Sequence, residues 1–266
     1  MKSYKAQDIR NIAIAGHGSR GKTTLAEAML YWAGLIDRMG RVADGNTVLD
    51  FDSEEKRRKT SVSTAIAPIE WKDCKINIID TPGLFDFAGG MSEGIRAAES
   101  VLIVTAAGSG YDVGADKAYK AAKKRGIARM FAVTRCDGEN ADFYKTFEAI
   151  KAEHKSSVCP VPYVEDGKVK SYVNLAARKA YEYKDGKPTE VPMPEDARIS
   201  EMLDILTETV ATSDEDLMEK FFAGEQFTRG EIAGALNKGV SEGNVYQLRR
   251  QRRLRYPRIC LRGLHG

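Results

Sequence analysis

The chain has 266 residues, of which 42% are hydrophobic and 30% are charged, and this composition excludes an intrinsically disordered protein. No stretch approaches the ~18 consecutive apolar residues that a membrane-spanning helix needs, and the first ten residues lack the apolar core of a signal peptide, so we expect a cytoplasmic protein that does not cross a membrane. The net charge of +3 comes from residues 247–266, whose seven arginines raise Lys+Arg from 34 to 41 against 38 acidic residues, so the main body lacks the basic character of a DNA-binding protein.

The first 80 residues alternate between short apolar runs and polar segments. Residues 11–15 predict a buried strand, and residues 23–39 predict a helix that follows a glycine-rich turn. The apolar face of that helix contains Leu25, Ala28, Met29 and Trp32. Residues 43–60 are polar and charged and predict a mobile loop. Two strands, over 61–71 and 74–80, complete this part of the chain.

Helix and strand patterns then alternate regularly. Helices are predicted over 91–98, 113–125 and 141–154, and strands over 100–106 and 130–134. This alternation predicts βαβ units, which form a mainly parallel sheet with helices on both faces. The expected fold class is therefore α/β.

The pattern changes after the last of these helices. Residues 160–191 show short alternating runs with Asp-Gly turns at 166–167 and 185–186, which are typical of β-hairpins. Residues 195–239 predict two or three amphipathic helices, one of which begins after an Asp214 cap. The apolar residues expected to face inward on that helix are Leu217, Phe221 and Phe222. This part predicts a smaller α+β subdomain.

Residues 16–23, G-H-G-S-R-G-K-T, fit the phosphate-binding pattern G-x-x-x-x-G-K-[ST] between a predicted strand and a predicted helix. Glycines let backbone N–H groups approach a phosphate closely, and the helix N-terminus adds a favourable dipole. Lys22 is expected to neutralise the β- and γ-phosphates, and Thr23 is expected to ligate Mg²⁺. The alternative is a glycine-rich connection without a ligand.

Two acidic turns at strand ends predict the rest of the nucleotide site. Asp80 ends a strand, where it can hold Mg²⁺ through water while the Gly83 N–H meets the γ-phosphate. Asp137 follows the strand over 130–134, and its carboxylate can accept hydrogen bonds from N1–H and N2–H of guanine, which adenine does not offer. This selects GTP over ATP. An acidic helix cap is the alternative interpretation of the Asp137 turn.

In order and spacing, these three motifs resemble those of translational GTPases, and the sequence between them is similar to elongation factor G. The helix and first switch loop of that family resemble LYWAGLIDRMGRVADGNTVLDFDSEEKRR, and its second switch resembles DTPGLFDF. The helix after its guanine site resembles ENADFYKTFEAI, and its inserted subdomain resembles VPMPEDARISEMLDILTETVATSDEDLMEKFFAGEQFT. The resemblance runs from about residue 8 to Tyr246 and points to a divergent branch of elongation factor G-like proteins.

The resemblance implies a P-loop NTPase G domain in three parts. These are a GTP-binding core over 1–155, an inserted α+β subdomain over 156–246, and a basic tail over 247–266 outside the family pattern. It also implies a cytoplasmic GTPase that binds GTP, GDP and Mg²⁺, forms GDP and phosphate, and acts with the ribosome, contacting ribosomal RNA and proteins.

The resemblance adds Ser61 as the first-switch hydroxyl of the magnesium shell and places Leu84 where the family has a water-orienting histidine. The expected nucleotide-binding residues are Gly16, His17, Gly18, Ser19, Arg20, Gly21, Lys22, Thr23, Thr24, Asp80, Gly83, Thr134, Arg135 and Asp137. The expected metal ligands are Thr23, Ser61 and, through water, Asp80. The expected catalytic residues are Lys22, Gly83 and Leu84, the last impaired because leucine neither donates nor accepts a hydrogen bond.

Other positions also depart from the family pattern. Ser19 replaces an aspartate of the phosphate loop. The guanine motif, usually Asn-Lys-x-Asp, begins with Thr134 and Arg135. Losing the asparagine amide is expected to weaken the loop's internal hydrogen bonds, whereas the Arg135 stem can still cover the base.

Residues 247–266 stand where the family pattern expects a strand and a small-residue loop, roughly Pro-Val-x-Cys-Gly-Ser-Ala, that closes over guanine. They lack the apolar run of a strand, which predicts an exposed sheet edge beside 130–134. One interpretation is a basic tail that contacts RNA. The other is a shifted reading frame at the end of a longer protein, because codons can be chosen for which dropping one nucleotide restores a Gly-Ser-Ala loop.

Four functions remain open on the sequence. The first is an elongation factor G-like GTPase, or a fragment of one. The second is a ribosomal-protection GTPase of the tetracycline-resistance type. The third is a GTP-binding module with little or no hydrolysis, which Leu84 allows. The fourth is a generic ATP-using P-loop protein, which Asp137 opposes.

Overall fold

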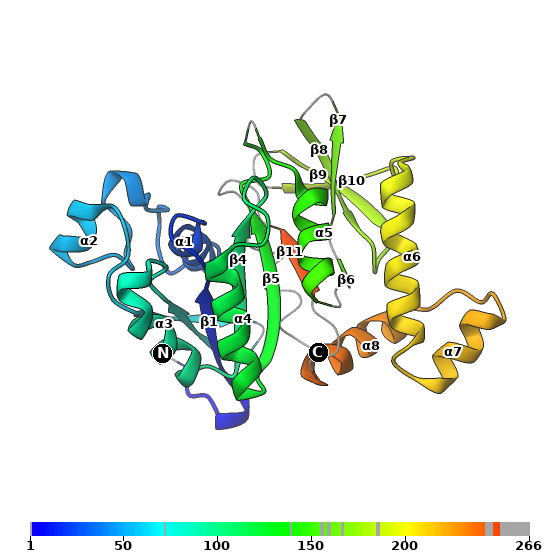
Figure 1. Ribbon diagram of the computed structural model, residues 1–266, viewed down its shortest axis with the longest axis horizontal. Helices are drawn as coiled ribbons and strands as arrows, with labels where there is room; N and C mark the ends of the chain where they lie inside the picture. Colours follow the sequence, from blue (N-terminus) through cyan, green and yellow to red (C-terminus); the bar gives the residue numbers. More distant parts are fainter. Residues whose placement is uncertain are drawn as a thin grey trace.

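The computed structural model describes residues 2–71, 73–138, 140–154, 157–158, 161–165, 168–184, 187–242 and 247–250. Within these residues, seven strands form the larger sheet: β1 Ile9–Ala15, β2 Ala65–Trp71, β3 Cys74–Asp80, β4 Ser100–Ala106, β5 Ala128–Thr134, β6 Ser157–Val158 and β11 Gln247–Arg250. Their order across the sheet is β2-β3-β1-β4-β5-β11-β6, and every neighbouring pair is parallel except β2 with β3. Figure 1 shows β1, β4, β5, β11 and β6 in this order. The expected α/β fold with a mainly parallel sheet is confirmed.

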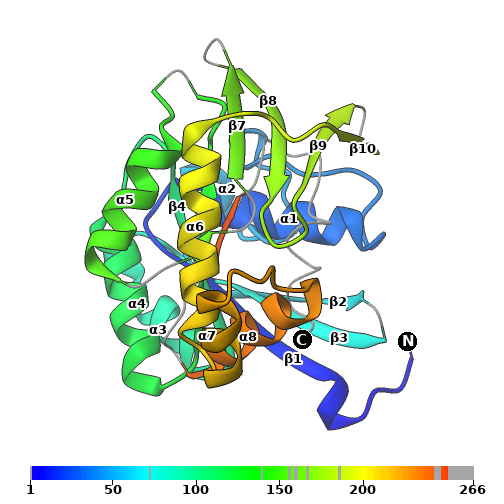
Figure 2. The same cartoon turned by 90° about the vertical axis from the view of Figure 1, so that its right-hand side faces the viewer.

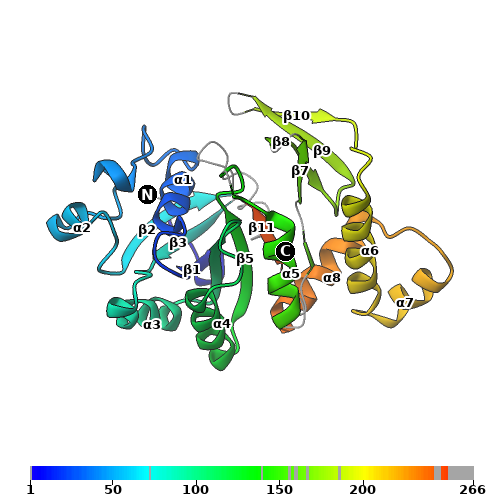
Figure 3. The ribbon, with the colours of Figure 1, turned by 45° about the horizontal axis from the view of Figure 1, so that its top comes forward.

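Two apolar cores lie on opposite faces of this sheet. The helices that cover it are α1 Lys22–Trp32, α3 Ala88–Ala97, α4 Val113–Arg125 and α5 Phe143–Glu153. Helix α1 packs on the face that includes Ile14 and Leu102, and the other three pack on the face that includes Ala13 and Ile103. Figure 3 shows α1 on the opposite side of the strands from α3 and α4. None of the helices in the described part of the chain has the length and apolar character that crossing a membrane requires.

Helix α1 ends at Trp32 instead of continuing to residue 39 as expected. Gly34 has a φ of +75°, in the left-handed region that glycine adopts readily, and the Leu35 N–H donates to the Leu30 carbonyl over 3.0 Å. These contacts end the helix and start the segment that leads to the first switch loop.

Residues 43–60 contain a helix, so the expectation of a loop throughout is wrong. Helix α2 spans Ser53–Arg58. The Asp52 side chain accepts from the Glu54 N–H (2.7 Å), and the Glu55 side chain accepts from the Asp52 N–H (3.2 Å), so the helix begins with a capping box. The segment lacks apolar periodicity, which is why the pattern indicated a loop.

The second part of the chain is α+β, as expected. Its four-stranded sheet has the order β10-β9-β8-β7, with β7 Val161–Glu165, β8 Lys168–Asn174, β9 Lys179–Lys184 and β10 Lys187–Val191. Its helices are α6 Ala197–Ala211, α7 Glu215–Phe222 and α8 Arg229–Glu242 (Figure 2). Strands β7–β8 and β9–β10 pair antiparallel as the expected hairpins require, whereas the turn residues 166–167 and 185–186 lie outside the described residues. Side chains of α6 and α8 join the same core as α5, so the two parts are continuous.

Helix α7 begins where expected but does not face the core as expected. The Asp214 side chain accepts from the Asp216 N–H over 3.2 Å and caps the helix. Leu217 is partly buried against the core, but Phe221 is 37% exposed and Phe222 is 80% exposed. The inward orientation predicted for the two phenylalanines is therefore wrong, because α7 packs mainly against one neighbour, α6, and none of its side chains is fully buried.

Strand β11 covers the sheet edge that the sequence predicted to be exposed, so that prediction is wrong. Residues 247–250 pair in parallel with Met130–Val133 of β5 on one side and with β6 on the other. Ladder hydrogen bonds use backbone groups, which any residue except proline supplies, so pairing does not require an apolar run. The segment from residue 247 thus contributes a strand to the core sheet.

Candidate nucleotide-binding site

The phosphate-binding loop connects β1 to α1, and its shape depends on two glycines. Gly16 has a φ of +137°, and a Cβ there would collide with the Val104 carbonyl of β4. Gly21 has a φ of +88° and is the N-terminal cap of α1. Only glycine adopts both conformations without strain, so the loop turns tightly and brings its backbone close to whatever it encloses.

Lys22 and Gly83 both lie against this loop. Lys22 is buried, and its Nζ donates to the His17 carbonyl over 2.8 Å. Burial lowers the pKa of Lys22, and the negative charge of Asp80 opposes that shift. A Cβ on Gly83 would collide with Lys22 Nζ and lie 2.6 Å from Gly18 N. The structure therefore brings together the lysine and the Gly83 backbone.

A cluster of hydroxyl and carboxylate groups lies beside Lys22. Thr23 Oγ1 is 2.9 Å from Ser61 Oγ, and the Ser61 hydroxyl donates to Asp50 Oδ1 over 2.7 Å. Among the described residues, Asp50 Oδ2 and Asp80 Oδ1 are buried without a hydrogen-bond partner. Burial raises the pKa of Asp80 to about 7, while a hydrogen bond from Thr23 and the charge of Lys22 oppose the shift. Oxygen donors of this kind are what Mg²⁺ prefers, so these residues fit a magnesium ion.

Asp50 is a member of this cluster that the sequence pattern did not single out. It stood inside a polar stretch that predicted a loop, where one more acidic residue carries no signal. Asp50 is 3% exposed, and burial raises its pKa while the hydrogen bond from Ser61 opposes the shift. The positive charge of Lys22 also opposes the rise in the pKa of Asp50, so Asp50 interacts with the lysine of the phosphate loop.

Leu84 and Phe85 hold the second switch on the phosphate loop by apolar contacts. A Cβ on Gly18 would lie 2.8 Å from Leu84 Cδ2, so the leucine side chain touches the loop. The Phe85 ring meets the His17 ring edge-on with centroids 5.4 Å apart, and Lys117 Nζ lies 3.9 Å from the Phe85 centroid. Leu84 thus lies against the phosphate loop and offers no polar atom to a water molecule.

An ion pair braces the other side of the phosphate loop. Arg20 Nε lies 2.8 Å from Asp112 Oδ2, and Asp112 Oδ1 accepts from the Ala115 N–H over 2.9 Å as the cap of α4. Gly114 in the first turn of α4 leaves room for His17, since a Cβ there would lie 2.6 Å from its N and Cβ atoms. The phosphate-loop pattern predicted a nucleotide-binding role for Arg20 but did not include Asp112, whose position just before a predicted helix was the available signal.

Among the residues of the predicted guanine motif, Thr134 contacts the phosphate-binding loop. Its hydroxyl lies 2.7 Å from the Arg20 carbonyl oxygen and 3.1 Å from that of Thr105, so the side chain still ties the base-side turn to the phosphate loop in place of asparagine. Arg135 is exposed with a φ of +51°, and Asp137 is exposed at the same end of β5. The carboxylate is therefore accessible to a base.

These elements enclose a hollow of about 260 Å³. Its lining residues are Gly18, Ser19, Gly21, Lys22, Thr23, Thr24, Val42, Ala43, Lys59, Thr60, Ser61, Gly83 and Arg135. The phosphate loop, the first switch and the guanine motif therefore share one cavity. The remaining predicted residues lie outside this lining: Gly16, His17, Arg20, Asp80, Leu84, Thr134 and Asp137.

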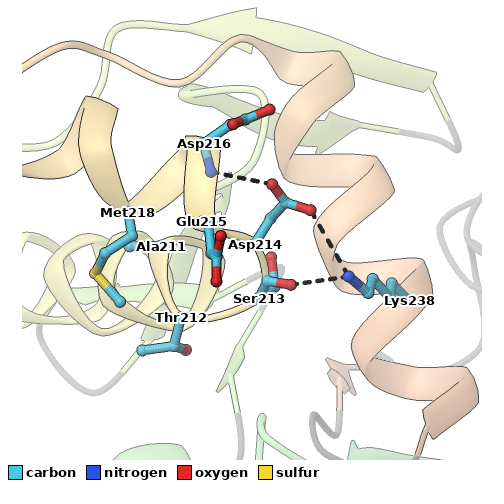
Figure 4. Close-up of a pocket in the computed structure, with 8 residues that line it drawn as sticks. All are labelled: Ala211, Thr212, Ser213, Asp214, Glu215, Asp216, Met218 and Lys238. Carbon is cyan, nitrogen blue, oxygen red and sulfur yellow. Dashed lines mark hydrogen bonds and ion pairs between the residues drawn. The ribbon is translucent and has the colours of Figure 1, made fainter.

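A larger hollow of about 520 Å³ lies where α6, α7 and α8 meet (Figure 4). In the close-up, Asp214 lies between Asp216 and Lys238. The Lys238 Nζ donates to the Ser213 carbonyl over 3.1 Å and is 3.7 Å from Asp214 Oδ2. These polar groups bind one another and hold α6, α7 and α8 together. The groups that fit a nucleotide line the smaller hollow instead.

Comparisons with known proteins agree with this geometry. Residues 7–240 match the family described as "Elongation factor Tu GTP binding domain". The chain is 34% identical over 242 residues to an "Elongation factor G-like protein" in two strains of Mycobacterium tuberculosis. These alignments cover 90% of this chain and 34% of each relative, so the chain spans about a third of the relatives' length.

The fold is also similar to a crystal structure of a protein from Thermus thermophilus. The TM-score is 0.88 with 31% identity, over 96% of this chain and 39% of that one. The strand order, the loop between β1 and α1, and a match over most of the chain all agree. The chain therefore belongs to the elongation factor Tu GTP-binding domain family, in which it is similar to elongation factor G-like proteins.

Proposed function

We propose that the chain binds GTP and GDP together with Mg²⁺ and hydrolyses GTP slowly, as part of a cytoplasmic translational GTPase that acts on the ribosome. One observation carries the proposal. Lys22, Thr23 and Ser61 line one cavity at the N-terminus of α1. The buried carboxylates lie behind this lining, where Asp50 accepts from Ser61 and Asp80 acts on the charge of Lys22. Exposed Asp137 supports the choice of guanine, because its carboxylate can accept from two base N–H groups.

The residues divide the work of binding and hydrolysis. Backbone N–H groups of the phosphate loop and the ammonium of Lys22 hold the phosphates in place. Thr23, Ser61 and Asp80 would hold Mg²⁺, which neutralises charge on the phosphates when bound. The Gly83 N–H can contact the γ-phosphate. Hydrolysis also needs a water oriented in line, and Leu84 cannot orient one, so we expect tight retention of GTP and slow turnover.

A nucleotide titration tests the binding proposal. The unmodified chain should bind fluorescent GDP in the presence of Mg²⁺, and GTP should compete for that site while ATP should not. Lys22→Ala should abolish binding without changing the far-UV circular dichroism spectrum, because the ammonium faces the loop. Lys145→Ala changes an exposed lysine on α5 and should leave binding unchanged. Equal competition by ATP and GTP would remove the basis for the guanine assignment.

A binding module without hydrolysis is the second candidate. The contact of the Leu84 side chain with Gly18 favours it, since an apolar group covers the loop where a polar one is expected. Phosphate release, measured with and without ribosomes, separates the candidates. Stimulation by ribosomes supports the translational GTPase, whereas release at the background rate under both conditions supports the module.

A further inference from the structure

Glu27 is a fully buried carboxylate that no step of the proposed chemistry uses. It lies on α1, four residues after Thr23, and is 0% exposed. Its oxygens accept three backbone N–H groups, from Gly40 (3.2 Å), Val48 (2.7 Å) and Leu49 (3.1 Å). These three residues lie outside helices and strands, so their N–H groups have no ladder or helix partner to replace the carboxylate.

Glu55 does the same near the other end of the segment over residues 40–63. It is 2% exposed, and its Oε1 accepts from the Val62 N–H (2.9 Å) and the Ser63 N–H (3.0 Å). Hydrogen bonds from N–H groups to a carboxylate are stronger than those between neutral groups, so each acid fixes backbone more firmly than an amide would.

Two of the backbone groups that bind these acids lie next to Asp50 and Ser61. Leu49, bound by Glu27, directly precedes Asp50, and Val62, bound by Glu55, directly follows Ser61. The Ser61 hydroxyl is hydrogen-bonded to the Thr23 hydroxyl, and Asp50 accepts from the Ser61 hydroxyl. Each buried acid therefore fixes the backbone next to Asp50 or Ser61, which belong to the cluster of oxygen donors beside Lys22.

We infer that Glu27 and Glu55 are positioning residues for the proposed magnesium ligands. They hold the backbone of residues 40–63 so that Ser61 can hydrogen-bond to Thr23, and Asp50 to Ser61. The inference rests on the proposed function for its binding measurement. Both acids should affect the part of nucleotide binding that depends on Mg²⁺. The groups that they position are oxygen donors suited to Mg²⁺ and do not belong to the phosphate loop.

The test compares variants at both acids with a matched control. Glu27→Ala removes all three acceptors, whereas Glu27→Gln keeps an oxygen for Val48 and Leu49 and loses the one for Gly40. Glu55→Gln is the corresponding change at the other end. Glu201→Gln removes an exposed carboxylate on α6 as the control. Fluorescent GDP is titrated at a series of Mg²⁺ concentrations and again in excess EDTA.

Each variant except the control should raise the Mg²⁺ concentration at half-maximal GDP binding, by about tenfold for Glu27→Ala and less for the glutamine variants. GDP affinity in EDTA should stay within about twofold of the unmodified chain. Equal losses in Mg²⁺ and in EDTA would show a merely structural role and overturn the inference, as would no change in either. Should Glu27→Ala fail to fold, Glu27→Gln carries the same comparison.

Limited trypsin digestion gives a measurement that needs no nucleotide. Arg57, Arg58 and Lys59 are exposed cleavage sites inside the held segment. The Glu27 and Glu55 variants should be cut there severalfold faster than the unmodified chain, and the control should not. If the unmodified chain binds no GDP, the proposed function fails while this measurement still decides the inference, because unchanged cleavage would refute it.

Discussion

Thr134 occupies the first position of the guanine motif, and its hydroxyl has two carbonyl oxygens in reach but only one hydrogen to donate. The shorter contact is to Arg20 of the phosphate loop. Thr134→Val should weaken GDP binding about fivefold, equivalent to the ~1 kcal/mol of one hydrogen bond, because the loop loses its tie to β5. Fluorescence titration measures the change.

Thr134→Ser is the matched variant, since it keeps the hydroxyl and removes a methyl group. Its GDP affinity should stay close to that of the unmodified chain. If the valine and serine variants bind equally, the hydroxyl does not hold the loop.

The proposed role of Asp137 is to select the base, and under that proposal its carboxylate should be needed for the preference for GDP over ADP. Asp137→Asn replaces one acceptor oxygen by a donor and should lower GDP affinity by roughly 1–3 kcal/mol. Asp142→Asn makes the same change at the cap of α5, where asparagine also caps, and should have little effect. Competition titrations with both nucleotides measure this, and a preference that survives in Asp137→Asn would contradict the assignment.

Leu84 should limit turnover more than binding. Leu84→His supplies a polar group beside Gly18 and should raise ribosome-stimulated GTP hydrolysis by ten- to a hundredfold, or ~1.4–2.8 kcal/mol of barrier. The measurement is phosphate release with and without ribosomes. Fast hydrolysis with leucine in place would mean that another group orients the water.

His154 connects the end of α5 to α4 and β5. Its ring stacks on Tyr119 with centroids 3.7 Å apart, and its Nε2 is 2.8 Å from the Tyr111 hydroxyl. Burial lowers the pKa of His154, and the charges of Glu153 and Asp116 oppose that shift. The folded chain therefore binds a proton less readily than the unfolded chain. Stability should be complete above the ordinary histidine pKa near ~6.5 and should fall as the pH drops below it.

Urea unfolding at a series of pH values tests the histidine. His154→Phe keeps a ring for stacking and removes this titration, so its free energy of unfolding should decline less between pH ~6.5 and pH ~5 than that of the unmodified chain. Parallel declines in the two chains would show that other groups cause the acid sensitivity.

At the scale of elements, apolar periodicity predicted most of the strands and helices and their order. It failed for α2, which is short and polar on all sides, so the only sequence signals were the Asp52 cap and Glu55 three residues later. It also failed for the inward face of α7, because the pattern shows that a face is apolar but not which neighbour covers it.

The candidate site was predictable where a contiguous motif defines it. Residues of the phosphate loop and Gly83 of the Asp80 turn line the same hollow. Asp50 and Glu27 were not predictable, because each acts on residues far away in the sequence, and a buried carboxylate looks like a surface one until the chain is folded. The division into a core over 1–155 and a subdomain over 156–246 remains a prediction.

At the scale of the whole molecule, β11 protects the sheet. A chain that stops after Glu242 lacks β11 and exposes the backbone of β5, which favours pairing with other chains. It should form larger species in size-exclusion chromatography than a chain that stops after Arg250. If both truncated chains elute as monomers, β11 is not needed to cover the edge.

The place of β11 in the sheet also has a consequence for synthesis. Strand β6 ends at Val158, and among the described residues its sheet partner is β11, which begins at Gln247. About 90 residues separate the two, and at ~5–20 residues per second their translation takes several seconds. During that interval β5 and β6 have no strand between them. The edges of β5 and β6 in the nascent chain therefore stay unpaired until β11 is made. A chaperone or a neighbouring nascent chain has most access to these edges during that time.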